Sequence, residues 1–255
     1  MKQLLMSEKP VEILREMISE GTLADFEPTL ATLKMPIPRG YHHKDNLEHS
    51  LRVLQNAIDR ETNGPDLILR AAALFHDIGK PKTRKLGTRK SVSFDGHEAA
   101  GATIVRQVLP KHGFSKNETK KIARLVFLHM RSHGFETADW TDSAVRRLIS
   151  DANNEEMLNR LIIVFYADTT TMNENKMRKI HSSVDKLVEE IARVKQVDSR
   201  KAMRPALNGF ELMEMFNLSE GRELGQIMRF LNSDDGIRLS KDEAVKVIKE
   251  KFINA

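Results

Sequence analysis

The dipeptide His76-Asp77 is the clearest combination of side chains in this sequence that could do chemistry. An imidazole nitrogen and a carboxylate in adjacent residues can bind the same divalent ion, and the two oxygens of the carboxylate can bridge two ions. The run before the pair, residues 67–75, is almost wholly apolar, which predicts a buried helix ending at His76. An unpaired buried carboxylate is costly, so Asp77 is expected to need a cation.

Taken alone, the dipeptide also fits a buried His–Asp hydrogen bond or a helix C-cap. Gly79 is expected to end the helix, and Lys80 places a positive charge beside the pair, as a phosphate-binding site would require. Residues 80–90 contain no acidic residue, and their basic residues are Lys80, Lys82, Arg84, Lys85, Arg89 and Lys90. Such a run favours an anionic substrate, and it fits an ordinary solvated loop equally well.

Four further residues could join the pair. His49 flanks the apolar stripe of one expected helix, His97 opens another, and His129 lies on the buried face of a third. Asp168 follows residues 161–167, one of the most apolar stretches in the chain. Each of these is, by itself, more simply a satisfied core histidine or a capping aspartate. Together they put one His or Asp on the inner face of each of five helical segments, which is hard to attribute to independent accidents.

The elements that must position these residues are almost all helices, because the hydrophobic periodicity is helical nearly throughout. Gly87 and the alternating residues 91–94 predict a small hairpin over 84–94, which is the only strand signal. The predicted fold class is all-α. Helices are predicted over about 10–20, 25–33, 45–60, 67–75, 96–109, 116–131, 141–151, 155–170, 172–204, 209–216, 221–231 and 241–252.

The predicted division is a domain over 1–200, with N-terminal helices in 1–40 packed on it, and a helical segment over 201–255. Pro205 is expected to break the preceding helix. No apolar run has the length that crossing a membrane requires. The 255 residues include no cysteine, so a metal would have to be held by His, Asp or Glu. That absence also fits a reducing cytoplasm, the predicted location.

The set His49, His76-Asp77 and Asp168 resembles the metal ligands of the HD-domain phosphohydrolases. His97 and His129 resemble the additional histidines of members that hold two metal ions. Six segments are also similar to the HD portion of bacterial tRNA nucleotidyltransferases (CCA-adding enzymes) and to the segment after it. These segments are residues 41–45, 76–81, 94–98, 144–147, 209–213 and 221–227.

The resemblance implies an HD-domain helical bundle with a small hairpin and a C-terminal helical appendage. It implies two divalent ions (Mn, Fe, Co, Ni or Mg) bridged by Asp77, and attack of a metal-activated hydroxide on phosphorus. Asp77 and Lys80 would be catalytic. The expected metal ligands are His49, His76, Asp77, His97, His129 and Asp168. The expected substrate contacts are Lys80, Arg84, His43, His133, Arg146 and Arg147.

One departure from those transferases decides the expected activity. Nothing before His42 resembles their head domain, and no Asp-x-Asp pair occurs, so CCA addition by this chain alone is not expected. The remaining expectation is a metal-dependent phosphohydrolase acting on a phosphomonoester or cyclic phosphodiester of a nucleotide or RNA end. An alternative is an RNA (tRNA)-binding module, as a headless relative or partner of a nucleotidyltransferase. A third is a helical scaffold whose metal only stabilises the fold.

Overall fold

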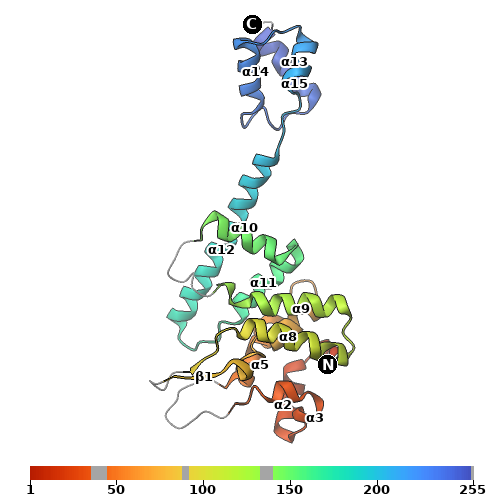
Figure 1. Ribbon diagram of the computed structural model, residues 1–255, viewed down its shortest axis with the longest axis vertical. Coiled ribbons are helices and arrows are strands. Elements are labelled where there is room, and N and C mark those ends of the chain that lie inside the picture. The colour runs from red at the N-terminus through yellow and green to blue at the C-terminus, as the bar shows by residue number, and fades with distance from the viewer. Residues whose placement is uncertain (36–44, 88–91, 133–139, 254–255) are drawn as a thin grey trace. The chain divides into compact units, whose positions relative to one another are not determined.

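A computed structural model describes residues 1–35, 45–87, 92–132 and 140–253. The described residues are mainly helical, which confirms the predicted all-α class (Figure 1). The chain divides into two compact units, Met1–Ala192 and Arg193–Ala255. The boundary falls within a long helix, a few residues before the predicted one. The assignment of residues 201–255 as a separate domain stays a prediction.

The first unit contains most of the helices and a pair of short strands. Its helices before the strands are α1 (Lys2–Leu5), α2 (Pro10–Glu20), α3 (Leu23–Phe26), α4 (Pro28–Ala31), α5 (Asn46–Ile58), α6 (Leu67–Phe75) and α7 (Lys80–Thr83). Those after the strands are α8 (His97–Val108), α9 (Lys116–Leu128), α10 (Asp142–Ala152) and α11 (Glu155–Ala167), with 3₁₀ turns η1 (Leu109–His112) and η2 (His129–Ser132). Helix α12 (Glu174–Ala202) contains the boundary between the units.

Helix α6 lies at the centre of the first unit. Its residues are buried from Ile68 to Phe75, as expected for a helix that is apolar on all sides. Asp66 caps it by accepting a hydrogen bond from the Leu69 amide at 3.0 Å. The face toward α5 and α11 forms one hydrophobic cluster. This cluster consists of Val53, Ala57, Leu69, Ala73, Val164 and Ala167.

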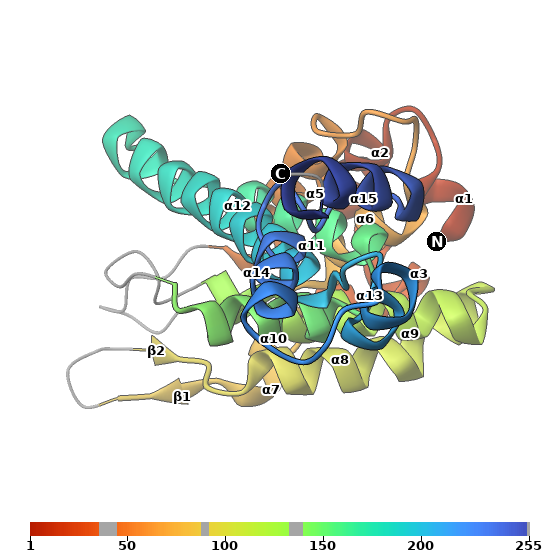
Figure 2. The same cartoon turned by 90° about the horizontal axis from the view of Figure 1, so that it is seen from above.

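On another side, α6 packs against α9, and α8 lies beside α9 along most of its length (Figures 1 and 2). Arg70 is the one charged side chain that α6 buries. It pairs with Glu61 through two short contacts and donates to the Leu5 carbonyl at 2.7 Å. This arrangement ties α1 to the central helix and satisfies a guanidinium that would otherwise be costly to bury.

One predicted helix is replaced by two. The expected helix over 25–33 is interrupted between α3 and α4, where Glu27 is extended with φ −151° and ψ 93°. The reason is Pro28, which disfavours helical backbone in the residue before it. Glu27 then caps α4, because its carboxylate accepts a hydrogen bond from the Thr29 amide at 2.8 Å.

The predicted strand signal is present as β1 (Lys85–Leu86) and β2 (Val92–Ser93), which pair antiparallel with Lys85 opposite Ser93. The second unit has its own core around α13 (Gly209–Phe216), α14 (Arg222–Leu231), α15 (Lys241–Ile248) and the π-helical turn η3 (Lys249–Ile253). None of the helices in the described part of the chain combines the length and apolar character that crossing a bilayer requires.

Candidate metal centre

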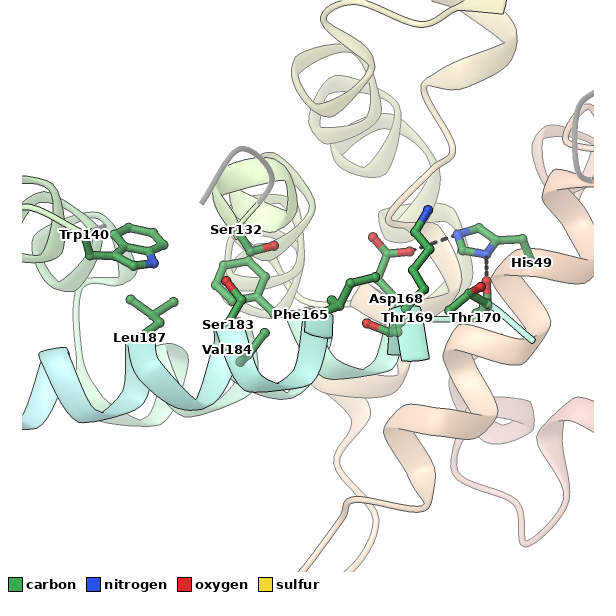
Figure 3. A pocket seen from close by; sticks show the side chains of 13 residues that line it. His49, Ser132, Trp140, Phe165, Asp168, Thr169, Thr170, Ser183, Val184 and Leu187 are labelled. Atoms are coloured by element: carbon green, nitrogen blue, oxygen red, sulfur yellow. Dashed lines mark hydrogen bonds and ion pairs between the residues drawn. The ribbon is translucent and has the colours of Figure 1, made fainter. Parts of the chain in front are cut away.

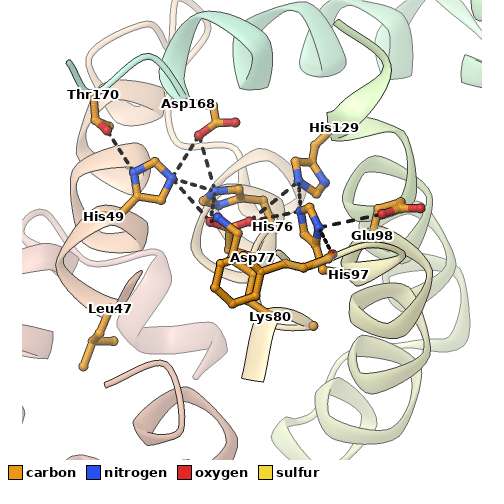
Figure 4. A network of polar contacts seen from close by, with 12 residues as sticks. Leu47, His49, His76, Asp77, Lys80, His97, Glu98, His129, Asp168 and Thr170 are labelled. Atoms are coloured by element: carbon orange, nitrogen blue, oxygen red, sulfur yellow. Dashed lines mark hydrogen bonds and ion pairs between the residues drawn. The ribbon is translucent and has the colours of Figure 1, made fainter. Parts of the chain in front are cut away.

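Six polar residues from five helices meet inside the first unit, and most of them stand at helix ends (Figure 4). His49 lies within α5, while His97 is the first residue of α8. The C-terminal caps of α6, α9 and α11 are His76, His129 and Asp168. Asp77 follows His76 directly. His76 and His97 lie at helix ends, as predicted. His129 and Asp168 were expected within the helices over 116–131 and 155–170, but they are the C-terminal caps of α9 and α11.

Two glycines let these helix ends come together. A Cβ atom on Gly79 would lie 2.0 Å from the His97 carbonyl oxygen and 2.6 Å from the Gly101 amide nitrogen. A Cβ contact under 3.0 Å is not tolerated, so only glycine fits at position 79. Gly96, the N-cap of α8, has φ +79°, a left-handed conformation that favours glycine. Both glycines therefore help to bring His97 to the Asp77 carboxylate.

The first group of ligand atoms is formed by His49, His76, Asp77 and Asp168. The Nε2 atoms of His49 and His76 are 3.1 Å apart, and they lie 3.4 Å and 3.2 Å from Asp77 Oδ2. Asp168 Oδ1 is 3.0 Å from His49 Nε2 and 3.5 Å from His76 Nε2. Two imidazoles and two carboxylates thus converge on one small volume.

The second group uses the other oxygen of Asp77. His97 Nε2 and His129 Nε2 are 3.2 Å apart, and they lie 3.4 Å and 3.8 Å from Asp77 Oδ1. Asp77 therefore belongs to both groups, with one oxygen facing each, and stands between the two histidine pairs in Figure 4. A carboxylate in this position is suited to bridge two cations.

Hydrogen bonds to the backbone determine which imidazole nitrogens carry lone pairs. The Nδ1 atoms of His76, His97 and His129 lie 2.8, 2.8 and 2.6 Å from the carbonyl oxygens of Ala73, Phe94 and Val126. A carbonyl oxygen can only accept, so each Nδ1 carries a proton. When the rings are neutral, each Nε2 atom presents a lone pair to the centre. This is the arrangement in which metal-binding histidines are usually held.

The charges of these residues also indicate a site that requires a cation. Burial by itself would raise the pKa of the Asp77 carboxyl, but His76, His97 and Lys80 outweigh it and hold that pKa well below its usual value. Burial also opposes charge on His76, yet Asp77 and Asp168 outweigh it and raise the pKa of His76 to about 10. Without a metal, a proton on His76 supplies the cation that the two carboxylates require.

His129, in the second histidine pair, has no such proton. Burial, together with the charge of His76, lowers the pKa of His129 to about 3, so its ring is neutral. When His97 is neutral as well, the two Nε2 lone pairs face each other and Asp77 Oδ1 with no hydrogen between them. A cation satisfies all three atoms at once. The donor set, neutral imidazole nitrogens plus carboxylate oxygens, therefore fits divalent metal ions.

Lys80 contacts one of the candidate metal ligands. Its ammonium lies 2.5 Å from Asp77 Oδ2 and 5.5 Å from the centre of the Phe94 ring. It thus binds the bridging carboxylate directly, and it also lines the pocket above the centre. A contact between Lys80 and a phosphate group stays a prediction.

Two pockets open from the centre. The central pocket, of about 860 Å³, is lined by Asn46, His49, Asp77, Lys80, Val92, Ser93, Phe94, Asp95, Gly96, His97, Glu98, His129, Met130 and Asp168. The Trp140 pocket, of about 260 Å³, is lined by His49, Ser132, Trp140, Phe165, Asp168, Thr169, Thr170, Thr171, Lys176, Ile180, Ser183, Val184 and Leu187. His49 and Asp168 line both pockets, so the two spaces adjoin at the ligand set.

Three of the expected substrate contacts line neither pocket. Arg84 follows α7, and Arg146 and Arg147 belong to α10, where Arg146 pairs with Asp142 at 3.3 Å. His43 and His133 lie outside the described residues. Substrate contact by any of these five residues stays a prediction.

Sequence reasoning missed two neighbours of the ligands. The Thr170 hydroxyl lies 2.9 Å from His49 Nδ1 and orients that ring. A Glu98 carboxylate oxygen lies 3.8 Å from His97 Nδ1. A usable signal existed for Thr170, because three consecutive threonines follow Asp168 directly.

Comparison with known proteins gives a family and several relatives. The HD domain model matches residues 46–173, which contain all six converging residues. The chain is 30% identical to the A-adding tRNA nucleotidyltransferase of Deinococcus radiodurans over 75% of this chain and 43% of that protein. It is 30% identical to the CC-adding tRNA nucleotidyltransferase of Thermus thermophilus over 90% of this chain and 50% of that protein.

A more distant relative carries another activity in its name. The bifunctional uridylyltransferase/uridylyl-removing enzyme of Rhodopseudomonas palustris is 24% identical over 65% of this chain and 19% of that protein. The chain spans about half the length, or less, of the relatives it matches.

Proposed function

Because the chain belongs to the HD domain family, we propose that it is a metal-dependent phosphohydrolase acting on a phosphomonoester or cyclic phosphodiester of a nucleotide or RNA end. The observation that carries this proposal is the position of the His97 and His129 Nε2 atoms, 3.2 Å apart beside the buried Asp77 carboxylate, which also belongs to the second group of possible ligand atoms. A divalent ion bound there would be coordinated by both imidazole nitrogens and by a carboxylate oxygen.

We propose two metal ions, each bound by one of the two ligand groups. His49, His76, Asp77 and Asp168 would hold one, and Asp77, His97 and His129 would hold the other. These mixed nitrogen and oxygen ligands suit Mn²⁺, Fe²⁺, Co²⁺ or Ni²⁺, and a single-ion site could use Mg²⁺. A bound divalent ion would supply Lewis acidity and a nucleophilic hydroxide at neutral pH.

The protein's own residues supply position and charge. The Asp77 carboxylate holds the two ligand groups together, and Lys80, at 2.5 Å from Asp77 Oδ2, keeps that carboxylate ionised and oriented. Thr170 orients the ring of His49 through its Nδ1 atom. Burial of His76, Asp77 and His129 excludes water from behind the ligands, so the reacting phosphate would approach from the central pocket.

The deciding experiment is a metal-supplemented screen against nucleoside monophosphates, 2′,3′-cyclic nucleotides and dinucleoside polyphosphates. We expect turnover by the parent protein, and we expect Asp77→Ala to abolish it and to reduce bound metal, since both ligand groups share that carboxylate. Asp59→Ala is the matched control, because Asp59 is a carboxylate on the same unit that contacts Gln55 instead. Hydrolysis retained in Asp77→Ala would contradict the assignment.

RNA binding is a second candidate function, favoured by the relatives' names. The match to the CC-adding enzyme covers 90% of this chain and therefore reaches into the second unit. An RNA-binding module would bind tRNA with a strong salt dependence, and binding would survive metal removal. Binding that disappears with the metal would count against this role. A cytoplasmic location stays a prediction.

A further inference from the structure

The Trp140 pocket is the strongest feature of the first unit that the phosphate chemistry leaves unused. It adjoins the ligand set at His49 and Asp168, yet most of its lining can neither bind a metal nor activate water. Figure 3 shows its two ends: Trp140 and Leu187 lie at one, and His49 and Asp168 lie at the other.

The lining of this pocket changes character from end to end. Trp140, Val184 and Leu187 offer a flat aromatic ring and an aliphatic floor, while Ser132 and Ser183 add hydroxyl groups. An indole next to apolar side chains stacks on a planar ring, and hydroxyls bond to the edges of a heterocycle or to a sugar. The complementary ligand has a flat heterocycle at one end and an anionic group at the other.

The size of the pocket limits that ligand further. Its volume of about 260 Å³ is slightly below the usual range for small-molecule sites, which is about 300 to 1,000 Å³. It has room for one ring system with its sugar. The larger central pocket, about 860 Å³, lies over both ligand groups and leaves space for the phosphate and water.

We propose that the Trp140 pocket binds the nucleoside portion of a mononucleotide whose phosphate lies over the metal centre. This inference rests on the proposed function. Trp140 stacks on the base, and the hydroxyls of Ser132, Thr169 and Ser183 contact the base edge or the ribose. The substrate class is then a free mononucleotide, and specificity resides in residues that hold no metal.

Trp140 is the only tryptophan in the chain, so its fluorescence reports on this pocket alone. The full chain, with metal chelated, is titrated with adenosine, cytidine and, separately, ribose. We expect saturable quenching by the nucleosides and none by ribose. Calorimetry should show roughly tenfold weaker adenosine binding for Trp140→Ala and a smaller loss for Trp140→Phe, which keeps a ring that can stack.

Phe210→Ala is the matched control, because Phe210 is an aromatic side chain that is 71% exposed and lines neither pocket. Circular dichroism of each variant shows whether it is folded. A second readout is the ratio of kcat/KM for AMP to that for ribose 5-phosphate, which should fall about tenfold in Trp140→Ala.

Equal responses to nucleosides and ribose would overturn the proposal, as would an unchanged ratio in the folded Trp140→Ala variant. A clear preference for a short RNA over AMP would overturn the mononucleotide assignment. These results distinguish the two proposals. Nucleoside binding without hydrolysis in the presence of added metal ions would support the nucleoside site and refute the phosphohydrolase activity. Hydrolysis of AMP and ribose 5-phosphate with equal kcat/KM would support the phosphohydrolase activity and refute the nucleoside site.

Discussion

At the scale of single residues, Asp77 and His76 illustrate how one buried pair can exchange a proton for a metal ion. In the metal-free protein, the raised pKa of His76, about 10, keeps its ring protonated at neutral pH. Asp77 and Asp168 are already ionised, because the pKa of each is held well below its usual value. A metal ion that binds His76 Nε2 must therefore displace the proton of that ring.

This exchange predicts the direction of a pH effect on metal affinity. Between about pH 7.5 and 9, below the pKa of about 10, each binding event should release one proton from His76. Affinity should rise about tenfold per pH unit in this window and level off above pH 10. Calorimetry in buffers with different ionisation enthalpies measures the proton count directly.

A histidine outside the centre is the control for that measurement. His112 Nε2 lies 2.6 Å from a Glu27 carboxylate oxygen, and His112→Gln should leave the slope with pH unchanged. An affinity that does not vary between pH 7.5 and 9 would show that His76 either loses its proton earlier or is not a ligand.

At the scale of elements, the site depends on the contact between the turn after α6 and the start of α8. Gly79→Ala would drive a methyl group into the His97 carbonyl, at 2.0 Å, and so push α8 away from Asp77. We expect a loss of about 1–3 kcal/mol of unfolding free energy from overpacking. We also expect weaker metal binding, because His97 moves with the helix. Thermal denaturation and metal titration measure the two effects.

Gly209→Ala is the matched glycine substitution. A Cβ atom there would have no neighbour within 4 Å, and Gly209 begins α13 in the second unit. Its stability and metal affinity should stay at the level of the parent protein. If Gly79→Ala bound metal as tightly as the parent protein does, the close approach of these two elements would not be needed for the site.

At the scale of the whole molecule, all six candidate ligands lie in the first unit, and the second has a separate apolar core. That core consists of Leu207, Leu212, Ile227, Leu231, Ala244 and Ile248. Adding metal to the full chain should therefore slow hydrogen exchange in α5, α6, α8, α9 and the end of α11, with α13–α15 unchanged, since a ligand stabilises the part that binds it. Mass spectrometry of the exchanged peptides gives this pattern. Equal protection in α13–α15 would show that the two units respond as one.

The sequence by itself was enough for the all-α class, because helical periodicity, caps and turn residues are local. Asp45, the first residue of the helix predicted over 45–60, caps α5 and accepts hydrogen bonds from the Leu47 and Glu48 amides at 2.9 and 3.1 Å. It was also enough to identify the six residues that converge, because a charged or imidazole side chain is conspicuous in an apolar helix. Pro28 shows the limit of the local pattern: the hydrophobic spacing predicts one helix over 25–33, and the residue before Pro28 is extended and separates α3 from α4.

Only the tertiary structure decided how those side chains face one another. The position of Asp77 between two histidine pairs depends on contacts between helices that are far apart in the sequence. His49 and Thr170, for example, are separated by 121 residues. His112 bonds to Glu27, which lies 85 residues earlier in the chain. Trp140 directly precedes the N-cap of α10, and it lines a pocket with residues of α12. Such contacts follow from how the helices pack, and local sequence patterns do not record the packing.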